Sequence, residues 1–127
     1  MTPATDLADT IHLTFAADTR NIAVARTLTA SMAARADLPL DQLEDARLAV
    51  DEALTVLIEG AAAGSTVTCT MTAAPGSLDV HVSAEASAEP SRTTFSWTVL
   101  SALADELDAR LADGRLTIML TISRHDA

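Results

Sequence analysis

Two adjacent carboxylates, Asp51 and Glu52, are the residues whose type and spacing are best suited to chemistry. They lie within residues 48–55 (LAVDEALT), where apolar side chains recur at helical spacing. A carboxylate on a helix face that borders a groove can act as a general base or hold a water molecule. Taken alone, such side chains are more often solvated charges on a helix surface. The pair is therefore a candidate active site that needs support from its surroundings.

Several other kinds of chemistry are excluded by the composition. There is no lysine, which excludes a P-loop lysine, a Schiff-base lysine and a protein-kinase strand lysine. The four glycines form no G-x-G pattern, so the usual glycine-rich phosphate cradles are absent. The three histidines (His12, His81 and His125) do not pair at metal-ligand spacing, so no metal site is predicted. The single cysteine, Cys69, excludes an internal disulfide and alternates with apolar residues, which predicts a core position.

The charge balance points to protein partners. The 127 residues include 18 acids and 8 bases, all arginine, for a net charge of −10. Such a chain repels phosphate backbones, so we expect no direct nucleic-acid binding, and it favours basic protein partners. The polar, acidic segment 1–10 has no secretory signal pattern, and no apolar run could span a membrane. We therefore expect a cytoplasmic protein without membrane contact.

The elements that would position the two carboxylates follow from periodicity and turn residues. Asp18 or Thr19 begins a helix that the Leu38-Pro39 pair ends, and Asp41, with Glu44 three residues later, caps a second helix. A third helix is expected from residue 95, and strands are predicted where apolar and polar residues alternate: 11–15, 66–72, 78–84, 107–111 and 116–122. Helices gather in the first half and strands in the second. This order predicts an α+β two-layer sandwich, a mostly antiparallel sheet covered by about three helices.

The domain organisation is expected to be simple. Residues 10–123 form one domain, preceded by a flexible tail over 1–9 and followed by a short tail over 124–127. Neither repeats nor a long linker divide the chain.

Residues 48–55 resemble the core of the N-box helix in RsbW- and SpoIIAB-type anti-sigma factors, which belong to the GHKL ATPase superfamily. Residues 95–105, which begin FSWTVL, are similar to the helix that follows their nucleotide lid, and 15–26 is similar in spacing. The likeness runs from about residue 11 to 122 and is closest to the divergent UsfX-like branch. It implies a GHKL, Bergerat-like ATPase fold.

The resemblance also implies a function. Such proteins bind an alternative, stress-response sigma factor and are released from it by a STAS-domain anti-anti-sigma factor. Many use ATP and Mg²⁺ to phosphorylate a serine on that antagonist, and they usually form homodimers. Two main alternatives follow: a binding protein that sequesters sigma factor, or a serine-protein kinase. A third is a dimerising domain that keeps the fold and has lost both roles.

Departures from the family pattern fall in the nucleotide site. In the N-box E-x-x-x-N, Glu52 matches the catalytic glutamate, but Val56 replaces the Mg²⁺-binding asparagine. Where the D-x-G-x-G box should follow the strand, only Glu85 could imitate the adenine-reading aspartate. The G-x-G-L box is replaced by residues 94–97. We expect a degenerate site, no bound cofactor and no kinase activity. If a nucleotide is retained, Asp51, Glu52 and Glu85 are the candidate cofactor-binding residues, with Glu52 catalytic.

The partner surface depends less on those boxes. In the relatives it involves the first helix, and Arg26 falls at the matching place, so Arg26 and its neighbour Ile22 are candidate partner contacts. Phe95 and Trp97 are further candidates, since they either fill the emptied nucleotide pocket or form a protein-binding patch. We expect the first of these, because a loop that loses its ligand can collapse onto apolar side chains.

Overall fold

A computed structural model describes residues 9–125 of the chain. Its sheet has five strands in the order β1-β2-β3-β5-β4, and every neighbouring pair is antiparallel. The five predicted strands are all present: β1 Thr10–Ala16, β2 Thr66–Ala74, β3 Ser77–Glu85, β4 Glu106–Ala112 and β5 Arg115–Ser123. Apolar residues alternate with threonine and other polar residues along them, because one face of the sheet is buried and the other faces solvent.

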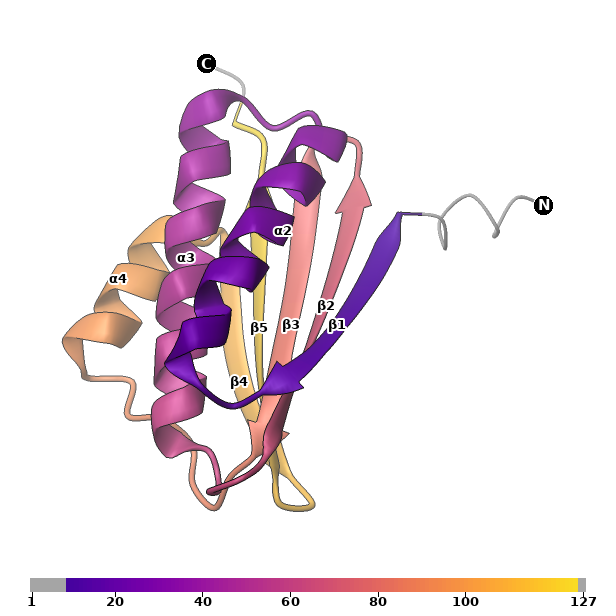
Figure 1. The fold of residues 1–127 in the computed structure, drawn as a ribbon. Coiled ribbons are helices and arrows are strands. Elements are labelled where there is room, and N and C mark those ends of the chain that lie inside the picture. The colour runs from indigo at the N-terminus through magenta and orange to yellow at the C-terminus, as the bar shows by residue number, and fades with distance from the viewer. Residues whose placement is uncertain (1–8, 126–127) are drawn as a thin grey trace.

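The helices form the second layer. They are the 3-10 turn η1 Thr19–Asn21, followed by α2 Ile22–Arg35, α3 Leu40–Gly60 and α4 Phe95–Leu103. Figure 1 shows α3 between α2 and α4, with all three helices over the same face of the sheet. The prediction of an α+β two-layer sandwich with about three helices is therefore confirmed. None of the helices in the described segment is long and apolar enough to cross a membrane.

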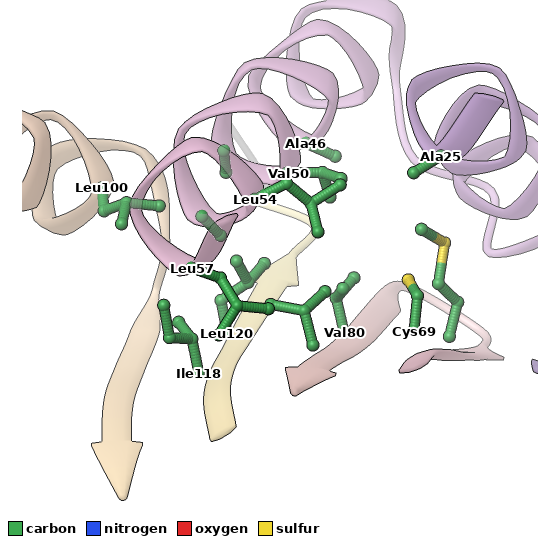
Figure 2. Close-up of a cluster of buried hydrophobic side chains, with 14 of the residues drawn as sticks. Ala25, Ala46, Val50, Leu54, Leu57, Cys69, Val80, Leu100, Ile118 and Leu120 are labelled. Atoms are coloured by element: carbon green, nitrogen blue, oxygen red, sulfur yellow. The ribbon is translucent and has the colours of Figure 1, made fainter. Parts of the chain in front are cut away.

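An aliphatic core fills the space between the layers (Figure 2). Val50, Leu54 and Leu57 of α3 are fully buried and lie over strand residues such as Val80 and Ile118. Full burial of each such side chain contributes about 1.5–3 kcal/mol. This core fixes how α3 sits on the sheet, and therefore where its remaining side chains face.

Cys69 lies in the same core, as predicted. It is fully buried, and burial raises the pKa of its thiol to about 11. The thiol therefore stays protonated near neutral pH and serves as a small apolar core residue.

The ends of the helices differ in part from the prediction. Asp18 does act as a cap, because its carboxylate accepts a hydrogen bond from the Arg20 backbone N–H, although it caps η1. The prediction of Asp41 as the cap of the second helix is wrong. Helix α3 begins at Leu40 with Pro39 at the cap position, and the Asp41 carboxylate accepts from the adjacent Gln42 N–H instead. A proline with extended ψ leads directly into a helix, so α3 begins earlier in the chain than predicted.

The predicted N-terminal tail lies outside the described residues except for its last residue, Asp9, whose carbonyl accepts from the Ala73 N–H. Part of the segment predicted as a C-terminal tail is held by hydrogen bonds. The Arg124 N–H donates to the Gly76 carbonyl, and the His125 N–H donates to the side chain of Gln42. Arg124 and His125 are thus attached to the domain, and the rest of the predicted tail, residues 126–127, lies outside the described residues.

Candidate functional site

The candidate carboxylate Asp51 lies on the side of α3 that faces α2, where it pairs with Arg26. The Arg26 Nη2 and Nε atoms lie 2.8 and 2.9 Å from the same oxygen, Asp51 Oδ1. Both side chains are about a third exposed. The structure thus joins a residue predicted to bind cofactor to one predicted to bind a partner. The sequence did not predict this contact, because the two residues are far apart and meet where their helices cross.

Glu52 lies one residue further along α3, about 100° around the helix from Asp51. Its side chain is half-buried, and within the described chain neither a hydrogen bond nor an ion pair engages its carboxylate. The two adjacent acids therefore have different surroundings. Asp51 is committed to Arg26, whereas Glu52 is available to water or to a partner.

A cavity of about 300 Å³ lies beyond Glu52, at the end of α3. Residues near the end of α3 line one side, and the loop before α4 together with the first turn of α4 lines the other. The lining residues are Val56, Glu59, Gly60, Pro90, Ser91, Thr94 and Ser96. Val56 stands at the position of the family's N-box asparagine, so this cavity corresponds to the place where a nucleotide would be expected. Asp51, Glu52 and Glu85 are not among its lining residues.

The residues of this cavity do not fit a magnesium nucleotide. A triphosphate is an anion that needs cationic or backbone N–H partners, and its Mg²⁺ needs oxygen ligands at one point. The only charged residue in the lining is Glu59, which would repel the phosphates, and Val56 has no atom that can coordinate a metal. Across residues 9–125 there is also no group of three acidic, histidine or cysteine side chains able to hold a metal ion.

Glu85, the candidate for reading adenine, does not line this cavity. It is the exposed last residue of β3 and lies opposite Arg115 of β5, and its carbonyl accepts a hydrogen bond from Ala62. The backbone of Glu85 therefore lies next to the segment that follows α3, but Glu85 is not among the residues that line the cavity.

Phe95 and Trp97 have opposite surroundings. Trp97 is 7% exposed and belongs to the core, whereas Phe95 is 81% exposed at the start of α4. The expectation that both residues fill the emptied nucleotide site is wrong for Phe95, whose side chain lies in solvent. Ile22 is also a core residue, with 8% exposure. Burial leaves Ile22 and Trp97 little surface to offer a partner, while Arg26 and Phe95 remain accessible.

Arg92 is a residue at this site that sequence reasoning missed. Its guanidinium lies 5.0 Å from the centre of the Trp97 ring, a cation–π distance. It also donates to the carbonyl of Ala109 and pairs with Asp108 at 3.2 Å. These contacts fasten the loop before α4 to β4. One feature of the sequence could have identified it, because Arg92 is the only arginine between residues 48 and 109.

A family model described as a histidine kinase-like ATPase domain matches residues 15–122, so the chain belongs to that family. Among its relatives is the anti-sigma-F factor RsbW of Mycobacterium tuberculosis, in strains CDC 1551 / Oshkosh and H37Rv. Each is 37% identical over 109 residues, which cover 83% of this chain and 63% of the relative. The chain thus spans less than two thirds of the relatives' length.

A solved structure gives the same fold. The crystal structure of the RsbU and RsbW domains of Rv1364c from Mycobacterium tuberculosis superposes with a TM-score of 0.67. At 19% identity it covers 93% of this chain and 34% of that one, and so supports the fold alone. The predicted resemblance to RsbW-type members of the GHKL superfamily is confirmed by these matches taken together.

Proposed function

We propose that this protein is an anti-sigma factor that sequesters an alternative sigma factor in the cytoplasm and does so without nucleotide. Its relatives in Mycobacterium tuberculosis carry the name anti-sigma-F factor, and its net charge of −10 favours a basic protein partner. The observation that carries nucleotide independence is the cavity beside Val56, whose single charged residue is the acid Glu59. A STAS-domain anti-anti-sigma factor releases the sigma factor, and the protein acts as a homodimer.

A second candidate function is an ATP-dependent serine-protein kinase that phosphorylates the anti-anti-sigma factor. Glu52 favours it, because its carboxylate is unengaged within residues 9–125 and lies on α3 a turn before the cavity. In this function Glu52 would be the catalytic base for the serine hydroxyl. The same cavity argues against it, since phosphoryl transfer depends on positioning and neutralising the phosphates.

Isothermal titration separates the two functions. The purified protein is titrated with ATP and Mg²⁺, and then, without nucleotide, with the sigma factor encoded nearest its own gene. We expect no heat from the nucleotide and saturable binding of the sigma factor. Micromolar ATP binding would move the kinase to first place, and failure of the wild-type protein to bind sigma factor would overturn the antagonist.

Two substitutions sharpen this test. Val56→Asn restores the family's metal-binding residue and should still give no ATP binding, because no cation is gained to meet the phosphates. Glu52→Gln removes the candidate base while keeping size and shape. Glu52→Gln and the wild type should show the same background level of serine phosphorylation. An ATP-dependent signal that the wild type shows and only this variant loses would establish the kinase.

A further inference from the structure

The outward side of α3 is the most acidic surface element in the described chain. The helix carries six carboxylates against one arginine, Arg47. The acids are Asp41, Glu44, Asp45, Asp51, Glu52 and Glu59, each of them exposed or half-exposed. Figure 1 shows that α2 and α4 flank α3 on its two sides and leave its outward side uncovered. We call this strip from Asp41 to Glu59 the α3 ridge.

An apolar side chain stands in the middle of the α3 ridge. Leu48 is 53% exposed, although the buried face of the same helix lies against a well-packed core. Glu44 and Glu52 lie four residues before and four after it, so one carboxylate stands on each side along the same face of the helix. A partner that covered Leu48 would remove apolar surface from water, while the flanking acids would select for basic neighbours.

The Arg26–Asp51 pair borders Leu48 on the α2 side. Asp51 is three residues after Leu48 and so shares its face of the helix. Both nitrogen contacts of Arg26 go to Asp51 Oδ1, and Oδ2 has no hydrogen-bond partner within residues 9–125. Within the described residues, Asp51 therefore keeps one carboxylate oxygen that can accept a further hydrogen bond, and the ion pair links its position to both helices.

We propose that the α3 ridge, centred on Leu48, is the docking surface for a basic, DNA-contacting segment of the sigma factor. This inference rests on the proposed function and names the surface that carries it out. Segments that contact DNA neutralise phosphates with lysine and arginine, so they present spaced positive charges. The ridge offers carboxylates at successive turns of one helix and an apolar anchor between them. Docking there occupies the residues that the sigma factor needs for DNA.

The apolar anchor is tested with a matched pair of variants. Leu48→Ala is compared with Val24→Ala, since Val24 is similarly exposed at 55% but lies two residues before Arg26, on the flank of α2 away from α3. The affinity for the purified sigma factor encoded nearest the gene is measured by isothermal titration. Leu48→Ala should weaken binding about tenfold or more, as loss of a central anchor does. Val24→Ala should bind as the wild type does.

The charges are tested by the salt dependence of the same binding. Glu44→Gln with Glu52→Gln should weaken binding and flatten its dependence on salt. The control, Glu106→Gln with Asp113→Asn, removes two exposed acids from the β4–β5 hairpin and should leave the dissociation constant and the salt slope close to those of the wild type. Circular dichroism checks that each variant is folded.

The two possible failures are distinct. If the wild-type protein binds no sigma factor, the proposed function fails and this surface fails with it. If the wild type binds, but Leu48→Ala and the double ridge variant bind equally well, the α3 ridge is overturned while the anti-sigma function stands. Equal weakening by the ridge and hairpin variants would also overturn it, because net charge and not this surface would then explain the binding.

Discussion

Among single side chains, the Arg26–Asp51 contact has the clearest bearing on the candidate site. It joins two helices, and its atoms are about a third exposed, so solvent screens the attraction between the charges. Exposed ion pairs typically contribute about 0.2–1 kcal/mol to stability. A pair of this kind does more to orient the Arg26 guanidinium than to hold α2 on α3. The buried residues of both helices hold them together.

A double-mutant cycle tests this interpretation. Arg26→Ala, Asp51→Ala and the double variant are compared by urea denaturation, and the coupling free energy should be below about 1 kcal/mol. The Arg47–Glu44 pair, which lies within α3, serves as a comparison of similar exposure. A coupling free energy of about 3 kcal/mol or more is the size expected for a fully buried pair, and it would contradict an orienting role.

Asp105 is a second residue whose effect can be measured. Desolvation raises the pKa of its carboxyl, but hydrogen bonds from the Ser123 backbone N–H and the His125 ring outweigh this, and its pKa is lowered below the usual 3.8. A lowered folded-state pKa stabilises the fold above the unfolded-state value, and this contribution is lost as the pH falls through the folded-state pKa.

Asp105→Asn should therefore lower the melting temperature at neutral pH, and its difference from the wild type should shrink as the pH falls below 3.8. Melting curves from pH 7 down to about pH 2 measure this, with Asp113→Asn in the β4–β5 turn as the control. A difference that stays constant over the whole range would mean that ionisation of Asp105 contributes nothing.

At the level of whole elements, the strands could be predicted almost completely from the sequence and the helix surroundings only in part. Alternation such as Val67, Cys69 and Met71 between threonines identifies a strand with one buried face, because a shift of one residue would expose every apolar side chain. What lies beside a helix depends on crossing geometry that no local pattern encodes. The Arg26–Asp51 contact follows from such packing, as does the absence of Glu85 from the residues that line the cavity.

Helix α4 illustrates the same limit. Its sequence FSWTVLSAL predicted the helix and its start, and the Thr94 hydroxyl caps it by accepting from the Trp97 N–H. Two aromatic residues at positions i and i+2 of a helix point in different directions, so Phe95 and Trp97 could not both enter one pocket. The structure buries Trp97 under Arg92 and leaves Phe95 in solvent.

Alanine substitutions should show this difference at α4. Trp97→Ala should cost about 3–5 kcal/mol of unfolding free energy, since it leaves a cavity and removes the ring beneath Arg92. Phe95→Ala should change stability by no more than about 0.5 kcal/mol, as for an ordinary surface position. Denaturant midpoints and slopes measure both, and similar losses for the two variants would place Phe95 in the core.

Viewed as a whole, the molecule has one continuous core between one sheet and three helices, and its surface carries the acid excess. The layers depend on each other, because the buried faces of the helices and of the sheet form a single hydrophobic cluster. This arrangement predicts a single cooperative unfolding transition.

Leu54→Ala tests that dependence. Leu54 is fully buried in α3 over the sheet, and its truncation should cost about 2–5 kcal/mol while the unfolding transition remains cooperative. Leu48→Ala, the same substitution on the exposed side of the same helix, should cost less than about 1 kcal/mol. Two separate transitions in Leu54→Ala would show that the helical layer and the sheet unfold independently.

The strand order has a consequence for how this protein is made. The last strand in the sequence, β5, lies between β3 and β4, and β4 pairs with β5 alone among the described strands. While the chain emerges from the ribosome, β4 therefore has no neighbour to join, and the apolar faces of β3 and α3 lack Leu116, Ile118 and Leu120. The domain can close only when β5 has left the exit tunnel, so its apolar surfaces need protection from aggregation until the last strand of the domain has been synthesised.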